Sequence, residues 1–89
     1  MVFEPFPGPP RPLRWRALGR RLRELREARG WSQRRLAREA RLPASDLGAI
    51  ESGTRQPGGG ILTRLADALE VDEQSLAALV RQTDRAVDG

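Results

Sequence analysis

The chain has 89 residues, enough for one domain, and it contains no cysteine, histidine or tyrosine. This composition excludes disulfides, thiolate or imidazole metal sites and a serine–histidine pair, so we expect neither an enzyme nor a bound metal or cofactor. No apolar run approaches the roughly 18 residues that span a bilayer, and Met1 to Pro12 lack a signal-peptide pattern, which predicts a cytoplasmic protein with no membrane partner.

The net charge of +4 is distributed unevenly along the chain. Residues 1–42 hold 12 arginines against four acidic residues, whereas residues 43–89 hold four arginines against eight acidic residues. The use of arginine without any lysine is explained by biased composition and indicates nothing about function. The uneven distribution is more informative, because a basic half beside an acidic half indicates a face that binds a polyanion.

Residues 1–12 include five prolines. Because proline fixes φ and lacks a backbone N–H group, this composition predicts a flexible, disordered Pro-rich arm. The simplest interpretation is a tail without a function of its own. The alternative is an arm that follows a DNA groove by means of Arg11, Arg14 and Arg16.

The first helix is predicted to begin directly after Pro12, because proline suits the first turn of a helix. Gly30 is expected to end it, since glycine tolerates a positive φ. Apolar residues recur along this segment at spacings of three and four, which is typical of a helix with one buried face. They are Trp15, Leu18, Leu22 and Leu25.

Ser32 is the expected N-cap of a second helix over residues 33–40. Its inward positions are Leu36, Ala37 and Ala40. Arg34 and Arg35 lie in its first turn, where the helix dipole favours acidic residues instead. A negatively charged partner at this helix end explains the two arginines, and so does biased composition.

Three further helices are predicted over residues 44–52, 61–69 and 73–85, with Gly53 closing the first of them. A glycine-rich loop over residues 54–60 precedes the second. Strand-like alternation is absent, so the predicted fold class is all-α with five helices. The expected apolar positions of the three helices are Leu47, Ile50, Ile61, Leu62, Leu65, Ala66, Leu69, Leu76, Leu79 and Val80.

Several short motifs stand together at characteristic spacings. They are Gly30-Trp31-Ser32-Gln33, Leu36-Ala37, Leu42, Leu47, Ile50-Glu51-Ser52-Gly53, Pro57, Leu65-Ala66, Ala68-Leu69 and Val71. Over about residues 18–80, this combination resembles the Cro/lambda-repressor-like (xenobiotic-response-element, XRE) helix-turn-helix family. The resemblance implies a five-helix DNA-binding domain over residues 13–86, following the arm at 1–12, with the helix-turn-helix itself at about 32–52.

Position by position, the resemblance implies a set of DNA contacts from the second and third helices and the loop after them. Gln33 matches the residue that holds a phosphate, and Trp31 matches a position that packs between helices. Base edges are reached from Ala44, Ser45 and Ala49. The whole candidate DNA-binding set is Ser32, Gln33, Arg34, Ala44, Ser45, Asp46, Ala49, Arg55, Gln56, Arg11 and Arg14. Arg26 and Glu51 match a buried ion pair with a structural role.

The sequence departs from the family pattern in two places. Arg41 stands where the turn usually carries glycine, and because a non-glycine residue in the left-handed conformation costs about 1 kcal/mol, we expect the turn to differ. The third helix also lacks the Gln, Asn, Arg or Lys side chains that usually read bases. Only Ser45, and Asp46 toward a cytosine amino group, offer polar contacts there. Specificity is therefore expected from DNA shape, the arm, dimerisation or a partner protein.

Two functions are consistent with these observations. The first is a DNA-binding transcriptional regulator, a repressor that binds a palindromic operator of double-stranded DNA as a homodimer, with or without a regulatory protein partner. Its expected dimer interface is formed by Leu76, Leu79 and Val80. The alternative is a protein-interaction module or adapter that keeps the fold but has lost specific base reading.

Overall fold

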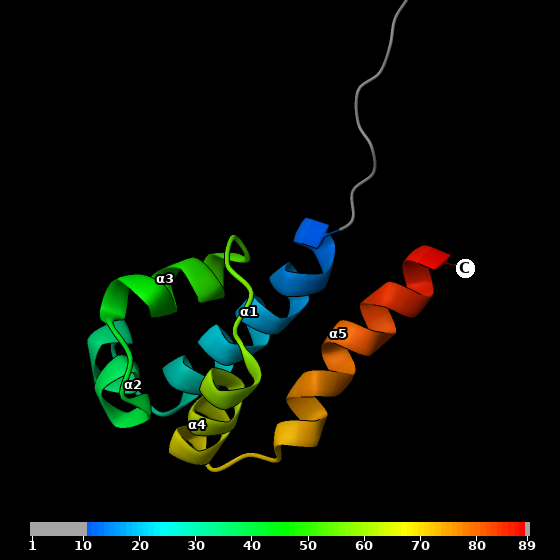
Figure 1. The fold of residues 1–89 in the computed structure, drawn as a ribbon. Helices are drawn as coiled ribbons and strands as arrows, with labels where there is room; N and C mark the ends of the chain where they lie inside the picture. The colour runs from blue at the N-terminus through cyan, green and yellow to red at the C-terminus, as the bar shows by residue number, and fades with distance from the viewer. Residues whose placement is uncertain (1–10, 89) are drawn as a thin grey trace, which may run out of the picture.

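The computed structural model describes residues 11–88, with side chains over residues 15–80, and contains five helices and no strand within that part of the chain (Figure 1). The helices are α1 (Arg11–Ala28), α2 (Gln33–Ala40), α3 (Ala44–Ser52), α4 (Gly59–Leu69) and α5 (Glu73–Asp88). The all-α fold class is confirmed.

The predicted limits of α2 and α3 agree with the structure, whereas those of the other three helices differ by a few residues. α1 begins at Arg11, so Pro12 lies inside its first turn, where its missing N–H group leaves no helical hydrogen bond unmade. α4 begins at Gly59, two residues earlier than predicted, and α5 continues to Asp88. The predicted arm, apart from its last two residues, lies outside the described residues.

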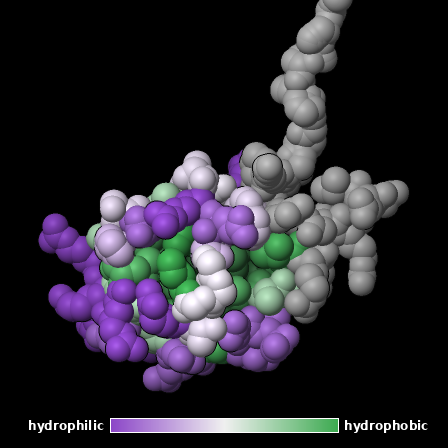
Figure 2. Space-filling model, viewed as in Figure 1, coloured by the Kyte–Doolittle hydropathy of each residue, from purple (hydrophilic) through white to green (hydrophobic). Residues whose placement is uncertain are grey.

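The core consists of leucines, alanines and one isoleucine from all five helices and from the turn between α2 and α3. Within it, α1 packs against α3 and α5, α2 packs against α3 and α4, and α4 packs against α5. The buried apolar residues are Leu18, Leu22, Leu36, Ala37, Ala40, Leu42, Leu47, Ile50, Leu65, Ala66, Leu69 and Leu76. The loop between α3 and α4 crosses in front of the core in Figure 1, and apolar residues are visible on either side of it in Figure 2.

Leu76 corrects part of the expected dimer interface. Its side chain is 1% exposed and belongs to the core of the single chain, so it is not available to a partner. α5 packs against α1 and α4, and Leu76 is the α5 residue whose side chain is buried in the core between them. Leu79 and Val80 are half-buried, and Val80 packs against the core from its edge.

Two arginine side chains bind the carbonyl groups at the ends of helices. Arg64 of α4 donates from Nε to the carbonyl oxygen of Ala40 at 2.9 Å and from Nη2 to that of Arg41 at 3.3 Å. Arg29 donates to the carbonyl oxygen of Leu69 at 3.0 Å, at the end of α4. The last carbonyls of a helix lack partners within the helix, so these bonds fix α2 and α4 relative to their neighbours.

Arg41 adopts the left-handed conformation, with φ 59° and ψ 52°, so the expectation that the turn would differ from the family pattern is wrong. Its N–H group donates to the carbonyl of Arg38, and the next N–H group donates to that of Ala37 at 2.9 Å. These bonds and the contacts of Arg64 offset the cost of the conformation. The turn keeps its shape without glycine.

None of the helices in the described part of the chain combines the length and the apolar character that crossing a membrane requires.

Candidate nucleic-acid interface

The outward face of α3 is a ridge of small side chains. The helix buries Leu47, Ile50 and Glu51 against the rest of the domain. Its other residues, Ala44, Ser45, Asp46, Gly48, Ala49 and Ser52, are exposed or half-buried. No large side chain stands on this face along the length of α3, so the helix backbone can lie close to the floor of a DNA major groove.

A buried network connects α1, α2 and α3 behind this face. Arg26 donates from Nε to Oε2 of Glu51 at 2.7 Å and from Nη2 to Oε1 at 3.0 Å. The two side chains are only 10% and 3% exposed, so the structure contains the ion pair expected between them. The hydrogen bond to Glu51 raises the pKa of Arg26 above its usual value; attraction to Glu51 and Glu27 acts in the same direction, and burial acts against it.

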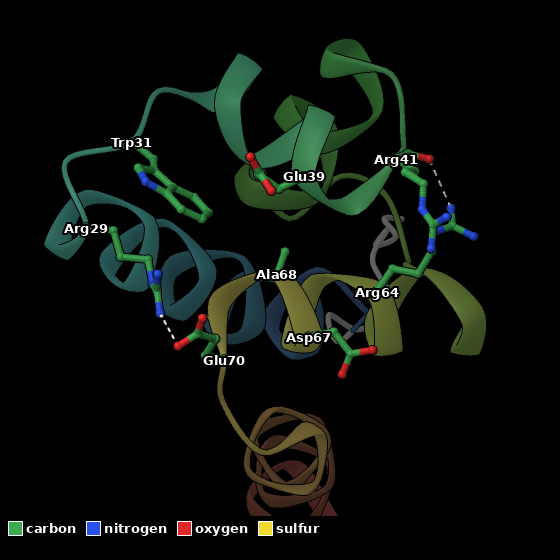
Figure 3. A pocket seen from close by; sticks show the side chains of 8 residues that line it. All are labelled: Arg29, Trp31, Glu39, Arg41, Arg64, Asp67, Ala68 and Glu70. Carbon is green, nitrogen blue, oxygen red and sulfur yellow. Dashed lines mark hydrogen bonds and ion pairs between the residues drawn. The ribbon is translucent and has the colours of Figure 1, made fainter.

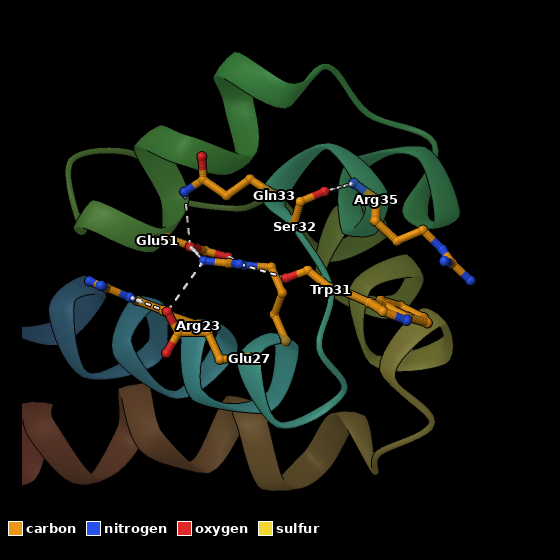
Figure 4. Close-up of polar contacts among 8 residues, drawn as sticks. Arg23, Glu27, Trp31, Ser32, Gln33, Arg35 and Glu51 are labelled. Carbon is orange, nitrogen blue, oxygen red and sulfur yellow. Dashed lines mark hydrogen bonds and ion pairs between the residues drawn. The ribbon is translucent and has the colours of Figure 1, made fainter.

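Gln33 extends this network to the surface. Its Nε2 donates to Oε1 of Glu51 at 3.0 Å, and Figure 4 shows the side chain reaching from the start of α2 to α3. A β-carbon on Gly48 would lie 3.6 Å from Oε1 of Gln33, so the amide lies over that glycine. An amide nitrogen carries two hydrogens, and the one not used by Glu51 remains a donor for an external acceptor.

The N-terminus of α2 carries positive charge and no acidic residue in its first turn. Ser32 caps it, accepting a hydrogen bond from the backbone N–H of Arg35 at 3.0 Å (Figure 4). The Arg35 side chain lies 4.7 Å from the ring centre of Trp31 and pairs with Glu39 at 3.1 Å. Arg34 is exposed and has no ion pair within the described side chains. Within the described part of the chain, this helix end therefore combines two backbone N–H groups without acceptors, those of Gln33 and Arg34, with the unpaired guanidinium group of Arg34.

Asp46 and Arg55 form an ion pair at the opposite flank of α3. Nη1 of Arg55 donates to Oδ1 of Asp46 at 2.8 Å, and the side chains are 48% and 27% exposed, respectively. Arg55 lies in the loop after α3, where Gln56 is also exposed. The acidic residue of the candidate interface is thus neutralised by a cation from the same interface.

A family model described as a helix-turn-helix domain matches residues 17–79. The chain belongs to the helix-turn-helix family of transcriptional regulators. A curated relative, the uncharacterized HTH-type transcriptional regulator YazB of Bacillus subtilis, is 37% identical over 59 residues, which cover 66% of this chain and 86% of YazB.

Two solved structures resemble this helix-turn-helix regulator over most of their length. The restriction-modification controller protein C.AhdI from Aeromonas hydrophila aligns with a TM-score of 0.68 and 39% identity, over 70% of this chain and 94% of C.AhdI. The clp gene regulator ClgR from Corynebacterium glutamicum aligns with a TM-score of 0.72 and 27% identity, over 83% of this chain and 79% of ClgR.

A cleft of about 400 Å³ lies between α2 and α4 of the regulator, away from the outward ridge of α3 (Figure 3). Two arginines of its lining are engaged within the protein. Arg29 binds the end of α4 and pairs with Glu70 at 3.3 Å, and Arg64 binds the end of α2. These arginines hold helices in place, so the cleft is not part of the candidate interface.

Nine of the predicted DNA-binding residues lie at the start of α2, on α3 and in the following loop, where contacts join Gln33 to α3 and Arg55 to Asp46. Arg11 and Arg14 belong to α1, and their side chains lie outside the described residues. Sequence reasoning did not predict the bond from Gln33 to Glu51 or the pair of Asp46 and Arg55. An acidic residue in the first turn of α3 and a single arginine in the next loop were the only signals for that pair.

Proposed function

We propose that this regulator binds double-stranded DNA as a homodimer on a palindromic operator and represses transcription by occupying promoter DNA. α3 enters the major groove, and the N-terminus of α2 binds a phosphate beside it. The observation that carries the proposal is that Gln33, in the first turn of α2, lies over Gly48 of α3, so the N-terminus of α2 stands beside the outward ridge of α3. Arg34 in the same turn is exposed and has no ion pair among the described side chains.

The phosphate contact is supported by three kinds of donor at the start of α2. Among the described residues, the backbone N–H groups of Gln33 and Arg34 and the second hydrogen of Gln33 Nε2 have no acceptor, and Arg34 supplies a full positive charge. The helix dipole acts in the same direction. A phosphate at this position also explains why the first turn contains two arginines and no acidic residue.

Dimerisation is supported by the chemistry of α3. Small side chains make few base contacts, so one domain alone has low sequence discrimination. A symmetric dimer contacts two half-sites about 34 Å apart. Because the two domains are linked, the dimer binds DNA more tightly than a single domain does, although neither domain makes an additional contact. The half-buried Leu79 and Val80 on α5 are the candidate residues for the two-fold contact.

The test is an equilibrium binding measurement on duplex DNA at several salt concentrations, after enrichment from genomic fragments. We expect one palindromic sequence to be enriched, with two chains per duplex by analytical ultracentrifugation. We also expect the logarithm of the binding constant to fall steeply with the logarithm of the salt concentration, because phosphate contacts release counterions.

Two variants, each adding one negative charge, test which face of the domain binds DNA. Ser45→Glu places a carboxylate on the outward ridge of α3 and should abolish binding, whereas Gln74→Glu places one on the exposed start of α5 and should leave binding unchanged. Equal behaviour of the two variants would contradict the assigned face. Absence of wild-type binding at low salt would contradict DNA binding itself and favour the protein-interaction module.

A further inference from the structure

Asp46 is the acidic residue whose carboxylate is available on the outward side of α3. The other acidic residue of the helix, Glu51, is buried, and both of its oxygens accept hydrogen bonds. Asp46 lies in the first turn of α3, and only its Oδ1 is occupied, by Nη1 of Arg55 at 2.8 Å. Its Oδ2 has no hydrogen-bond partner among the described residues. The interface therefore contains one oriented oxygen that accepts hydrogen bonds.

A lone carboxylate on this face would be repelled by DNA phosphates. The pair with Arg55 removes most of that repulsion, because two opposite charges in contact act as a nearly neutral group on phosphates farther away. The Arg55 side chain is 48% exposed and keeps further N–H groups for a phosphate. One guanidinium group is thus placed to hold Asp46 on one side and the DNA backbone on the other.

An ionised carboxylate accepts hydrogen bonds and donates none, which limits the bases it tolerates. In the major groove, guanine and thymine present acceptor oxygens, whereas cytosine N4 and adenine N6 present donors. Adenine places the acceptor N7 beside its amino group and is suited to the amide of Asn or Gln. Cytosine presents its amino group without an adjacent acceptor, so it is the base that matches the free oxygen of Asp46.

We propose that Asp46 is a specificity-determining residue that accepts a hydrogen bond from the N4 amino group of a cytosine in each half-site, with Arg55 as the residue that positions its carboxylate. This inference rests on the proposed DNA-binding function. Among the other outward residues of α3, Ala44, Gly48 and Ala49 supply only apolar contacts and shape, and the polar groups are the short hydroxyls of Ser45 and Ser52. Asp46 is then the main source of hydrogen-bonded base discrimination in a helix that lacks long polar side chains.

The experiment compares in vitro selection from random duplexes by the full chain and by Asp46→Asn, a variant of the same shape without the charge. We expect the wild type to select a C·G pair at one position of each half-site, and the variant to lose that preference at this position only. On two duplexes that differ only by C·G or T·A there, the wild type should prefer cytosine at least about fivefold, and the variant should bind both equally.

Arg55 is tested with two substitutions on the same pair of duplexes. Arg55→Met should reduce the preference for cytosine, because Asp46 is no longer held, and should lower the salt slope by about 0.9 if the phosphate contact is also lost. Arg55→Lys, which keeps a cation within reach of the carboxylate, should restore part of the preference. A change in folding alone cannot produce a base-specific loss, and thermal unfolding of each variant confirms that it is folded.

The outcomes separate this inference from the proposed function. If the wild type binds no duplex at low salt, the proposed function fails, and this inference fails with it. If the wild type binds selectively and Asp46→Asn selects the same sequence with the same preference, DNA binding stands and the role of Asp46 is wrong. A variant that binds every sequence more tightly by the same factor also contradicts the inference, because it shows only relief of repulsion.

Discussion

Gly19 of α1 lies so close to Ile50 of α3 that a β-carbon on Gly19 would stand 2.5 Å from the carbonyl oxygen of Ile50, and closer still to that of Glu51. These atoms belong to the backbone and cannot move aside as a side chain does. The approach allows α1 to bury the end of α3 directly beneath the interface. Glycine is therefore required at position 19 by packing, although its φ is ordinary.

Gly19→Ala should destabilise the domain because the two helices must separate to admit the methyl group. Overpacking of this kind costs about 1–3 kcal/mol. For a domain of this size, each kcal/mol lowers the melting temperature by about 4–8 °C. Thermal unfolding followed by circular dichroism measures the change.

Gly48→Ala is the matched control, since Gly48 is also inside a helix but its nearest neighbour would be the Gln33 side chain at 3.6 Å. That distance is ordinary van der Waals contact, so only the helix preference changes. Alanine is favoured over glycine in a helix by about 0.5–1 kcal/mol, and the melting temperature should rise. A fall of similar size in both variants would contradict the packing argument.

The buried pair of Arg26 and Glu51 gives a second prediction. Glu51→Ala removes the two carboxylate acceptors of the Arg26 guanidinium and the acceptor of Gln33, and leaves the buried charge with only the Trp31 carbonyl at 2.8 Å and Glu27 at 4.0 Å. Loss of one member of such a pair costs about 3–5 kcal/mol. We expect a large fall in the urea midpoint, with the slope unchanged. Glu24→Ala, which breaks the exposed pair of Arg21 and Glu24, should change stability little.

A double substitution of Arg26 and Glu51 by Met and Leu distinguishes the cost of an orphaned charge from the value of the pair. Apolar residues of similar volume often replace a buried ion pair without loss of stability. We expect the double variant to regain most of the stability lost in Glu51→Ala. A double variant as unstable as the single one would show that the hydrogen bonds to Trp31 and Gln33 carry the stabilisation instead.

Arg41 gives a third prediction, because its left-handed conformation suits glycine better than arginine. Arg41→Gly should relieve about 1 kcal/mol of strain, partly offset by the greater flexibility of glycine in the unfolded chain. The net result is a small rise in melting temperature. Arg41→Ala removes the same exposed side chain but keeps the strain, so an equal rise in that variant would show that strain is not the cause.

The helices could be predicted from the sequence where local signals mark their ends. Ser32 and Gly53 cap α2 and α3, and both helices have the expected limits. The turn at Arg41 shows where local reasoning fails, since contacts from Arg64, 23 residues away, stabilise a conformation that the residue itself disfavours. Local preference measures the cost of a conformation but not the distant bonds that offset it.

The same limit applies to the interface. The period of apolar residues on α5 places Leu76, Leu79 and Val80 on related faces, but only the packed structure separates the core residue Leu76 from the half-buried residues Leu79 and Val80. The resemblance to the family indicated the pair of Arg26 and Glu51. The pair of Asp46 and Arg55 depends on the path of the loop, which no periodicity encodes.

Gln33 and Arg34 give a fourth prediction, which separates a neutral phosphate contact from a charged one. Gln33→Ala removes a hydrogen bond from an uncharged amide, so affinity should fall several-fold while the salt slope stays the same. Arg34→Ala removes a charge that is unpaired in the described structure, so its affinity should fall and the slope should decrease by about 0.9. Fluorescence anisotropy on one labelled duplex over a range of salt concentrations measures both quantities.

Because phosphates are common to every sequence, both losses should be equal on specific and random duplexes. This distinguishes them from Asp46→Asn, whose effect depends on the base. Arg21→Ala on α1, where Arg21 is paired with Glu24, is the control for loss of an arginine elsewhere and should leave affinity and slope unchanged. A decrease in slope for Arg21→Ala as large as that for Arg34→Ala would mean that the net charge of the domain, rather than a phosphate at the start of α2, determines the binding.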